Sequence, residues 1–128
     1  MSIRRILNFK LKLPQPQSTM LKTTFLTLPN KYRKSEKIPL SEIVYLEANL
    51  NYTIIHLKDG NVRLSAQTLL FHVNNYLDES FIRIHRTFCV NKMHIEGFDK
   101  PHSPKYLLLN GGTKLTISRR QRKNLIRL

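Results

Sequence analysis

The sequence predicts a mostly β fold of short strands with one or two short α-helices, and three observations support this prediction. Short runs of apolar and β-branched residues recur from about position 21 onward, and turn residues separate them. Two of these turns carry glycine at the centre of a hairpin pattern. Only two segments are predicted to be helices, one from its apolar spacing and one from its capping residues, and 128 residues is the length of one domain.

Six runs are predicted to be strands: 24–28, 43–48, 52–58, 61–65, 106–109 and 113–117. Residues 43–48 are apolar in both alternating sets, which is typical of a strand buried on both faces. Asp59-Gly60 joins two of the runs as a hairpin turn in which both positions need positive φ. Asn110-Gly111-Gly112 joins the last two runs in a second hairpin of the same kind.

Two helices are predicted from apolar spacing and capping residues. Residues 67–77 place their apolar side chains on one face, and Ser65 is the expected N-cap. The second helix begins at Ser118, because Gln121 follows three residues later as in a capping box. Its first turn then holds Arg119 and Arg120 beside unpaired backbone N–H groups, an arrangement that suits a phosphate. Two solvated arginines on a surface helix are the alternative.

The charge of the chain is strongly basic, and it is concentrated at the two ends. Lys and Arg number 22 against 8 Asp and Glu, which gives a formal net charge of +14. Residues 1–37 carry nine basic residues and one acidic residue, and residues 83–128 carry eleven basic and two acidic residues. Residues 38–82 between them carry only two basic but five acidic residues. A small domain needs only about 2 to 8 net charges for solubility. The excess predicts a polyanionic partner, nucleic acid first and an anionic membrane surface second.

Residues 1–21 are predicted to form a loosely ordered basic arm, and residues 22–128 to form the domain. Pro14 and Pro16 interrupt any regular element in the arm, whose first 20 residues contain no acidic side chain. The chain has neither the apolar core of a signal peptide nor an apolar run long enough for a transmembrane helix. Cys89 is the only cysteine, so we expect a core thiol, no intrachain disulfide and a reducing, cytoplasmic location.

Residues 81–95 carry the most information about function. Apolar and polar residues alternate at first, a polar group at 85–87 interrupts them, and an apolar cluster at 88–90 precedes Asn91 and Lys92. This pattern indicates a buried element whose ends carry hydrogen-bond donors. Arginine reads guanine and asparagine reads adenine in the major groove, and both side chains also bind phosphates.

Four stretches of the chain, 38–48, 51–52, 81–95 and 115–120, resemble in order and spacing the LytTR-type DNA-binding domain. This family supplies the output domain of many bacterial response regulators, and the resemblance covers about 22–128. It implies a mostly β fold whose inter-strand loops enter two neighbouring major grooves and bend the duplex. It also implies a bacterial, sequence-specific transcription regulator of a two-component system, with no catalytic activity. Thr87 stands where serine is usual in the family.

Carried over by position, the resemblance implies two sets of DNA contacts. The bases would be contacted by Asn51, Arg86 and Arg119. Phosphate or loop contacts would come from Asn49, Tyr52, Arg83, His85, Lys92, Arg120, Arg122 and Lys123. The family's usual phospho-receiver domain is not recognisable in the basic arm. We therefore expect either a stand-alone protein or the output part of a longer one, whose signal arrives by another route.

Three other functions are left open by the residues, of which one is a membrane-surface or protein-docking module acting through residues 3–12. A basic RNA-binding or ribosome-associated domain fits the charge, although only Tyr52 stands beside a predicted binding loop to stack a base. A metal-dependent nuclease would use His85, Asn91 and His94, but no acidic residues with metal-ligand spacing accompany them. His56 and His72 are predicted to be ordinary, partly exposed histidines.

The expected partners follow from the preferred function. They are double-stranded DNA, a second copy of the chain on a repeated site, and a sensor or membrane protein at the basic arm. No metal, cofactor or small-molecule substrate is expected.

Overall fold

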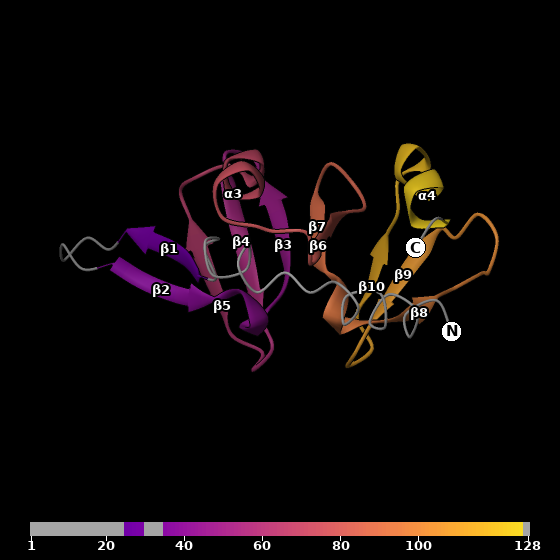
Figure 1. Ribbon diagram of the computed structural model, residues 1–128, viewed down its shortest axis with the longest axis horizontal. Helices are drawn as coiled ribbons and strands as arrows, with labels where there is room; N and C mark the ends of the chain where they lie inside the picture. Colours follow the sequence, from indigo (N-terminus) through magenta and orange to yellow (C-terminus); the bar gives the residue numbers. More distant parts are fainter. Residues whose placement is uncertain (1–24, 30–34, 127–128) are drawn as a thin grey trace, which may run out of the picture.

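The computed structural model describes residues 25–29 and 35–126, so the basic arm predicted at 1–21 lies outside the described residues. The described residues form three antiparallel sheets (Figure 1). Strands β1 (Phe25–Pro29) and β2 (Ser35–Pro39) form the first sheet. The second has the order β5-β4-β3-β7-β6 and the third the order β10-β9-β8. The predicted mostly β fold is therefore confirmed.

The strands of the second and third sheets are short. Those of the second are β3 (Ile43–Asn49), β4 (Tyr52–Leu57), β5 (Val62–Ser65), β6 (Phe81–Arg83) and β7 (Phe88–Asn91). Those of the third are β8 (Ile95–Phe98), β9 (Tyr106–Leu109) and β10 (Lys114–Thr116). The helices are α3 (Leu69–Asn75) and α4 (Arg119–Ile126), and two 3-10 turns occupy Leu40–Glu42 and Lys92–His94. Strands β2 and β8 were not predicted from the sequence, and β6 and β7 lie in the segment 81–95, which was predicted only to be a buried element.

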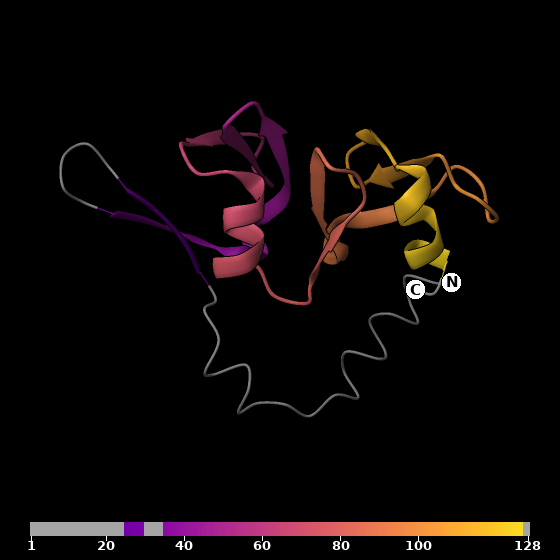
Figure 2. The ribbon, with the colours of Figure 1, turned by 90° about the horizontal axis from the view of Figure 1, so that it is seen from above.

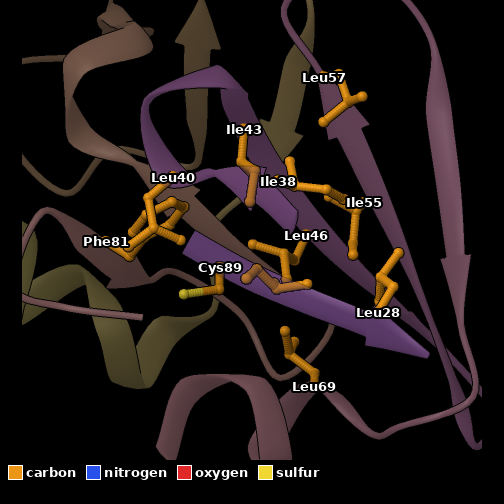
Figure 3. Packing of buried hydrophobic residues seen from close by; sticks show 11 residues of the cluster. Leu28, Ile38, Leu40, Ile43, Leu46, Ile55, Leu57, Leu69, Phe81 and Cys89 are labelled. Carbon is orange, nitrogen blue, oxygen red and sulfur yellow. The ribbon is translucent and has the colours of Figure 1, made fainter. Parts of the chain in front are cut away.

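The central sheet is covered on both faces by two separate apolar clusters. Leu46 and Cys89 belong to the first cluster, which also includes side chains of β1, β2 and α3 (Figure 3). Val90 belongs to the second cluster, which includes side chains of β9, β10 and α4. A register shift between Ile43 and Tyr45 lets both Ile43 and Leu46 reach the first cluster. Val44 and Tyr45 pack half-buried against the second cluster, so residues 43–48 contact both clusters, but only Ile43 and Leu46 are fully buried. The predicted two-face burial is therefore confirmed only in part.

The two clusters lie side by side along the molecule. Figure 2 shows the two-stranded sheet and α3 toward one end, the three-stranded sheet and α4 toward the other, and β6 and β7 between them.

Cys89 is 2% exposed, and burial raises the pKa of its thiol to about 12. The prediction of a core thiol is confirmed.

The predicted hairpins form, but one turn differs in detail. Gly60 adopts φ of 92° between β4 and β5, whereas Asp59 is not among the residues with positive φ. The Asp59 carboxylate instead accepts the Asn61 N–H at 2.9 Å, which closes a longer turn. The prediction that both positions need positive φ was therefore wrong here. Gly111 and Gly112 both have positive φ between β9 and β10, as predicted.

The first helix begins later than predicted, and its cap is a different residue. Thr68 is the N-cap of α3, and its hydroxyl accepts the Phe71 N–H at 3.2 Å. Ser65 ends β5 instead, where its buried hydroxyl lies 2.8 Å from the Nε2 atom of His72. His72 is fully buried, so the prediction of a partly exposed histidine was wrong. Apolar spacing places a side chain on a helix face, but it does not reveal how deeply that face is covered.

The Asn91 side chain connects β7 to the segment that leads into β3. Its amide nitrogen lies 3.3 Å from the Leu40 carbonyl and 3.0 Å from the Ile43 carbonyl, to which it donates hydrogen bonds. Its side-chain oxygen accepts the Met93 N–H at 3.0 Å. Both ends of this buried amide are therefore engaged with the backbone, as a buried polar side chain requires.

Candidate nucleic-acid interface

Three loops share one edge of the central sheet, although they are far apart in the sequence. Strands β3 and β7 are antiparallel neighbours, so the end of β3 and the start of β7 lie at the same edge. There the Ala48 N–H donates to the Thr87 carbonyl at 2.7 Å. The Ser118 N–H donates to the Ile84 carbonyl at 2.9 Å, which joins the start of α4 to the same loop. Figure 1 shows this edge at the top, and we call it the loop edge.

A groove of about 610 Å³ opens where the β6–β7 loop meets α4. Its described lining consists of Arg83, His85, Arg86, Ser118, Arg120 and Gln121. Three of these six side chains are arginines, and none of the six is a carboxylate. A groove of this composition favours an anion or the acceptor atoms of a base edge.

Arg86 stands at the exposed tip of the β6–β7 loop, and the backbone beneath it is held by hydrogen bonds. The Nε atom of Arg83 donates to the His85 carbonyl at 3.0 Å, and its Nη2 atom donates to the Arg86 carbonyl at 2.7 Å. The Thr87 N–H donates to the Nδ1 atom of His85 at 3.1 Å. The loop therefore presents the Arg86 side chain from an ordered backbone.

The start of α4 carries the third arginine of the groove. The Ser118 hydroxyl accepts the Gln121 N–H at 3.3 Å, so the predicted N-cap is present. Arg119 and Arg120 are both exposed, but only Arg120 lines the groove. Neighbouring residues of a helix point about 100° apart, because a turn holds 3.6 residues, so the two arginines face different directions.

The rest of α4 offers two more cations of different character. Lys123 is exposed. Arg122 is half-buried, and its Nε atom is enclosed with no hydrogen-bond partner among the described residues. Gln121 was not predicted to line a groove, because its spacing from Ser118 indicated only a capping role. Residues three apart on a helix are neighbours, so the spacing from Ser118 was the signal that could have placed Gln121 beside Ser118 in the groove.

The β3–β4 turn contributes a polar, exposed surface at the same edge. Asn49 and Asn51 are exposed, and Tyr52 is 49% exposed. Leu50 adopts a positive φ of 57° and is 92% exposed. These residues do not line the groove, so they form a second exposed region at the loop edge.

Lys92 lies at the other end of β7 from the loop edge. At a rise of about 3.4 Å per residue, the four residue steps from Phe88 to Lys92 span roughly 14 Å. The Lys92 N–H donates to the Ser80 carbonyl at 2.8 Å, which also belongs to that distant end. The structure therefore does not bring Lys92 together with Arg86, Arg120 and the β3–β4 turn.

The acidic residues of the middle segment lie mostly away from the loop edge. Four of them occupy the opposite ends of the strands: Glu42, Asp59, Asp78 and Glu79. A hydrogen bond from the Asn61 N–H lowers the pKa of Asp59, which keeps this carboxylate charged. Glu47 lies nearer the loop edge, but its carboxylate is 3.0 Å from the Nε2 atom of His56. Most of the acidic side chains of the middle segment therefore lie at the end of the central sheet opposite Arg86 and Arg120.

The nuclease alternative gains no support from the described residues. Asn91 is committed to backbone groups on both ends of its amide, as shown above. No group of three or more His, Cys, Asp or Glu side chains within residues 25–29 and 35–126 is arranged to hold a metal ion. In the same part of the chain, no helix is long and apolar enough to cross a membrane.

A mostly β domain on which arginines from distant segments converge in one groove has the fold and the charge of a nucleic-acid-binding module. The family model described as the LytTr DNA-binding domain matches residues 33–128, so the chain belongs to the LytTR family. It is accordingly a DNA-binding domain of transcription regulators, and its partner is double-stranded DNA. This is the family that the sequence resembled.

A solved structure supports the same assignment. The chain is similar to the LytTr DNA-binding domain of a Bacillus cereus protein assigned as a methyl-accepting/DNA response regulator. The two share 26% sequence identity and superpose with a TM-score of 0.65. The match covers 82% of this chain and 94% of the other. The comparison with curated proteins gave no match.

Proposed function

We propose that this domain binds double-stranded DNA sequence-specifically and regulates transcription by placing its loop edge against the duplex. The observation that carries the proposal is the groove in which Arg86 and Arg120, from two distant segments, converge beside His85. Two guanidinium groups presented from ordered backbone suit the bidentate recognition of guanine. The acidic residues at the opposite edge reduce repulsion between the protein and the phosphates.

We propose a division of these contacts into base readers and phosphate anchors. Arg86 and Arg120 read bases in one major groove, and Asn51, flanked by Asn49 and Tyr52, reads bases in the neighbouring one. The exposed Arg119 and Lys123, together with Arg122, contact phosphates on either side of α4. This division exchanges the predicted roles of Arg119 and Arg120, because only Arg120 shares the groove with Arg86.

We also propose that the duplex bends toward the loop edge. Successive major grooves on one side of a duplex are about 34 Å apart, so two contact regions on one protein edge favour a curved DNA. Energy transfer between dyes at the two ends of a bound duplex measures this bend. A straight duplex, with the same transfer in the free and bound states, would contradict it.

The proposal is tested by selecting bound sequences from a random duplex pool at physiological salt. We expect a recurrent motif, and two copies spaced by about one helical turn would indicate a second protein copy on a repeated site. Recovery of no motif, or displacement of the duplex by single-stranded RNA, would overturn the proposal in favour of non-specific or RNA binding.

Variants then test the division of contacts on the selected duplex and on a random one. Arg86→Ala and Arg120→Ala should each cost about 1–3 kcal/mol and relax the preference at particular base pairs. Arg119→Ala should weaken binding to both duplexes equally and lower the salt slope by about one. Lys92→Ala is the matched control, because it removes a cation at the opposite end of β7. It should change neither the base preference nor the salt slope. Equal behaviour of Arg119→Ala and Arg120→Ala would contradict the division.

A further inference from the structure

Arg83 differs from the other cations of the groove in what its guanidinium contacts. It is half-buried in β6, and two of its nitrogen atoms donate to backbone carbonyls two and three residues further along the chain. Charge-assisted hydrogen bonds of this kind are stronger than neutral ones. The Arg83 guanidinium is therefore directed toward the backbone of its own loop, whereas a phosphate contact would require it to point toward the DNA.

The β6–β7 loop is held at each of its four carbonyl groups. The Ile84 carbonyl accepts the Ser118 N–H, and the Thr87 carbonyl accepts the Ala48 N–H. The His85 carbonyl accepts the Phe88 N–H at 3.1 Å in addition to Arg83. Within the described residues, the Arg86 carbonyl has Arg83 as its hydrogen-bond donor, at 2.7 Å. Arg83 is thus the side chain that fixes the peptide from which Arg86 projects.

We propose that Arg83 is a positioning residue, which sets the direction of the Arg86 side chain in the DNA groove instead of contacting a phosphate. This inference rests on the proposed function, in which Arg86 reads a base. Arg83 suits this role because its planar guanidinium donates in two directions from a rigid fork. A lysine at the same position keeps the charge, but its flexible ammonium does not reproduce the two fixed hydrogen bonds.

The charge-preserving variant Arg83→Lys separates the two roles. If Arg83 positions Arg86, binding of the variant to the selected duplex should fall by about tenfold or more, the typical effect of losing a hydrogen bond from a charged group. Its binding to random duplex and its salt slope should stay at the wild-type values. If Arg83 instead contacts a phosphate, Arg83→Lys should bind the selected duplex about as well as the wild type, because lysine also contacts phosphates. In that case Arg83→Gln, which removes the charge, should lower the salt slope by about 0.9.

A double-mutant cycle with Arg86→Ala tests the dependence on Arg86 itself. Once the Arg86 side chain is absent, Arg83→Lys should cause little further loss of discrimination between the selected and the random duplex. Additive losses in the double variant would overturn the inference. Arg63→Lys is the matched control, because Arg63 is a half-buried arginine that donates through Nε to Glu36 at 2.9 Å, away from the loop edge.

Hydrogen exchange of the free protein gives a readout that needs no DNA. Arg83→Lys should speed exchange at residues 84–88 relative to β3 and β4, and Arg63→Lys should not. The exchange rates of residues 84–88 and of β3 and β4 are measured in the same molecule. A general loss of stability would therefore speed exchange in both regions, whereas loss of the Arg83 hydrogen bonds would speed it in the loop alone. Unchanged exchange together with unchanged specific binding would overturn the inference. Failure of the wild-type protein to select any motif would instead overturn the proposed function.

Discussion

The buried histidine of α3 makes the stability of the domain depend on pH. His72 is fully buried, its Nε2 atom lies 2.8 Å from the Ser65 hydroxyl, and its Nδ1 atom has no hydrogen-bond partner among the described residues. Burial penalises the charged imidazolium and lowers the pKa of His72 from 6.5 to about 4. The native protein therefore keeps this histidine neutral in a pH range where the unfolded chain protonates it.

The size of the effect follows from the difference between the two pKa values of His72. Below pH 6.5 the unfolded state binds a proton that the native state does not, so the free energy of unfolding falls as the pH falls. The loss continues to about pH 4, where the native state also binds the proton. At 1.36 kcal/mol for each pH unit of separation, the total loss attributable to His72 is about 3 kcal/mol. Above pH 6.5 the histidine contributes no pH dependence.

Urea unfolding at a series of pH values between 7.5 and 4 measures this loss. His72→Gln removes the titrating ring and retains a hydrogen-bonding group near Ser65, so its stability should fall less steeply over this range than that of the wild type. His102→Gln is the matched control, because His102 is exposed, and it should keep the wild-type pH dependence. Equal losses for His72→Gln and the wild type would show that the buried ring does not govern the acid response.

Three further predictions concern side chains that hold the core and the loop edge. Asn91→Leu should lower the free energy of unfolding by about 2–3 kcal/mol in urea titrations, because buried backbone groups lose their amide partner; a neutral effect would contradict the anchoring role. Ser118→Ala should cost about 1 kcal/mol by removing the N-cap of α4, and unchanged stability would show that the cap contributes little. Cys89 should react with a thiol reagent at neutral pH only after unfolding, because the native thiol is buried with its pKa raised to about 12; rapid labelling of the native protein would refute this.

Local chemistry explains why several elements were predicted correctly from the sequence. The strand at Tyr106–Leu109 was predicted with its observed bounds, because glycines with positive φ follow it and end the strand. Ser118 caps α4 through a hydrogen bond that spans only three residues. Features of this kind depend on neighbours in the chain, so a short window of sequence is enough to predict them.

Elements that depend on distant partners were missed or misplaced. Strand β2, which begins Ser35-Glu36-Lys37, carries no strand pattern and forms by pairing with β1. Ser65 was predicted to cap α3, but pairing with Thr53 extends β5 through this residue and moves the cap to Thr68. Strand pairing across the sheet thus outweighs the local capping preference of serine.

The sequence by itself determined the kind of protein this is. Its basic ends, its four family stretches and its hairpin glycines predict a mostly β LytTR domain that binds DNA, and fold and family are confirmed. Only the tertiary structure decided which cations meet at the loop edge. It brings Arg86 and Arg120 into one groove, leaves Lys92 at the opposite end of β7 and turns Arg83 into its own loop. The reason is that sheet order, strand register and helical phase set these positions, and each depends on pairing between segments that are far apart in the chain.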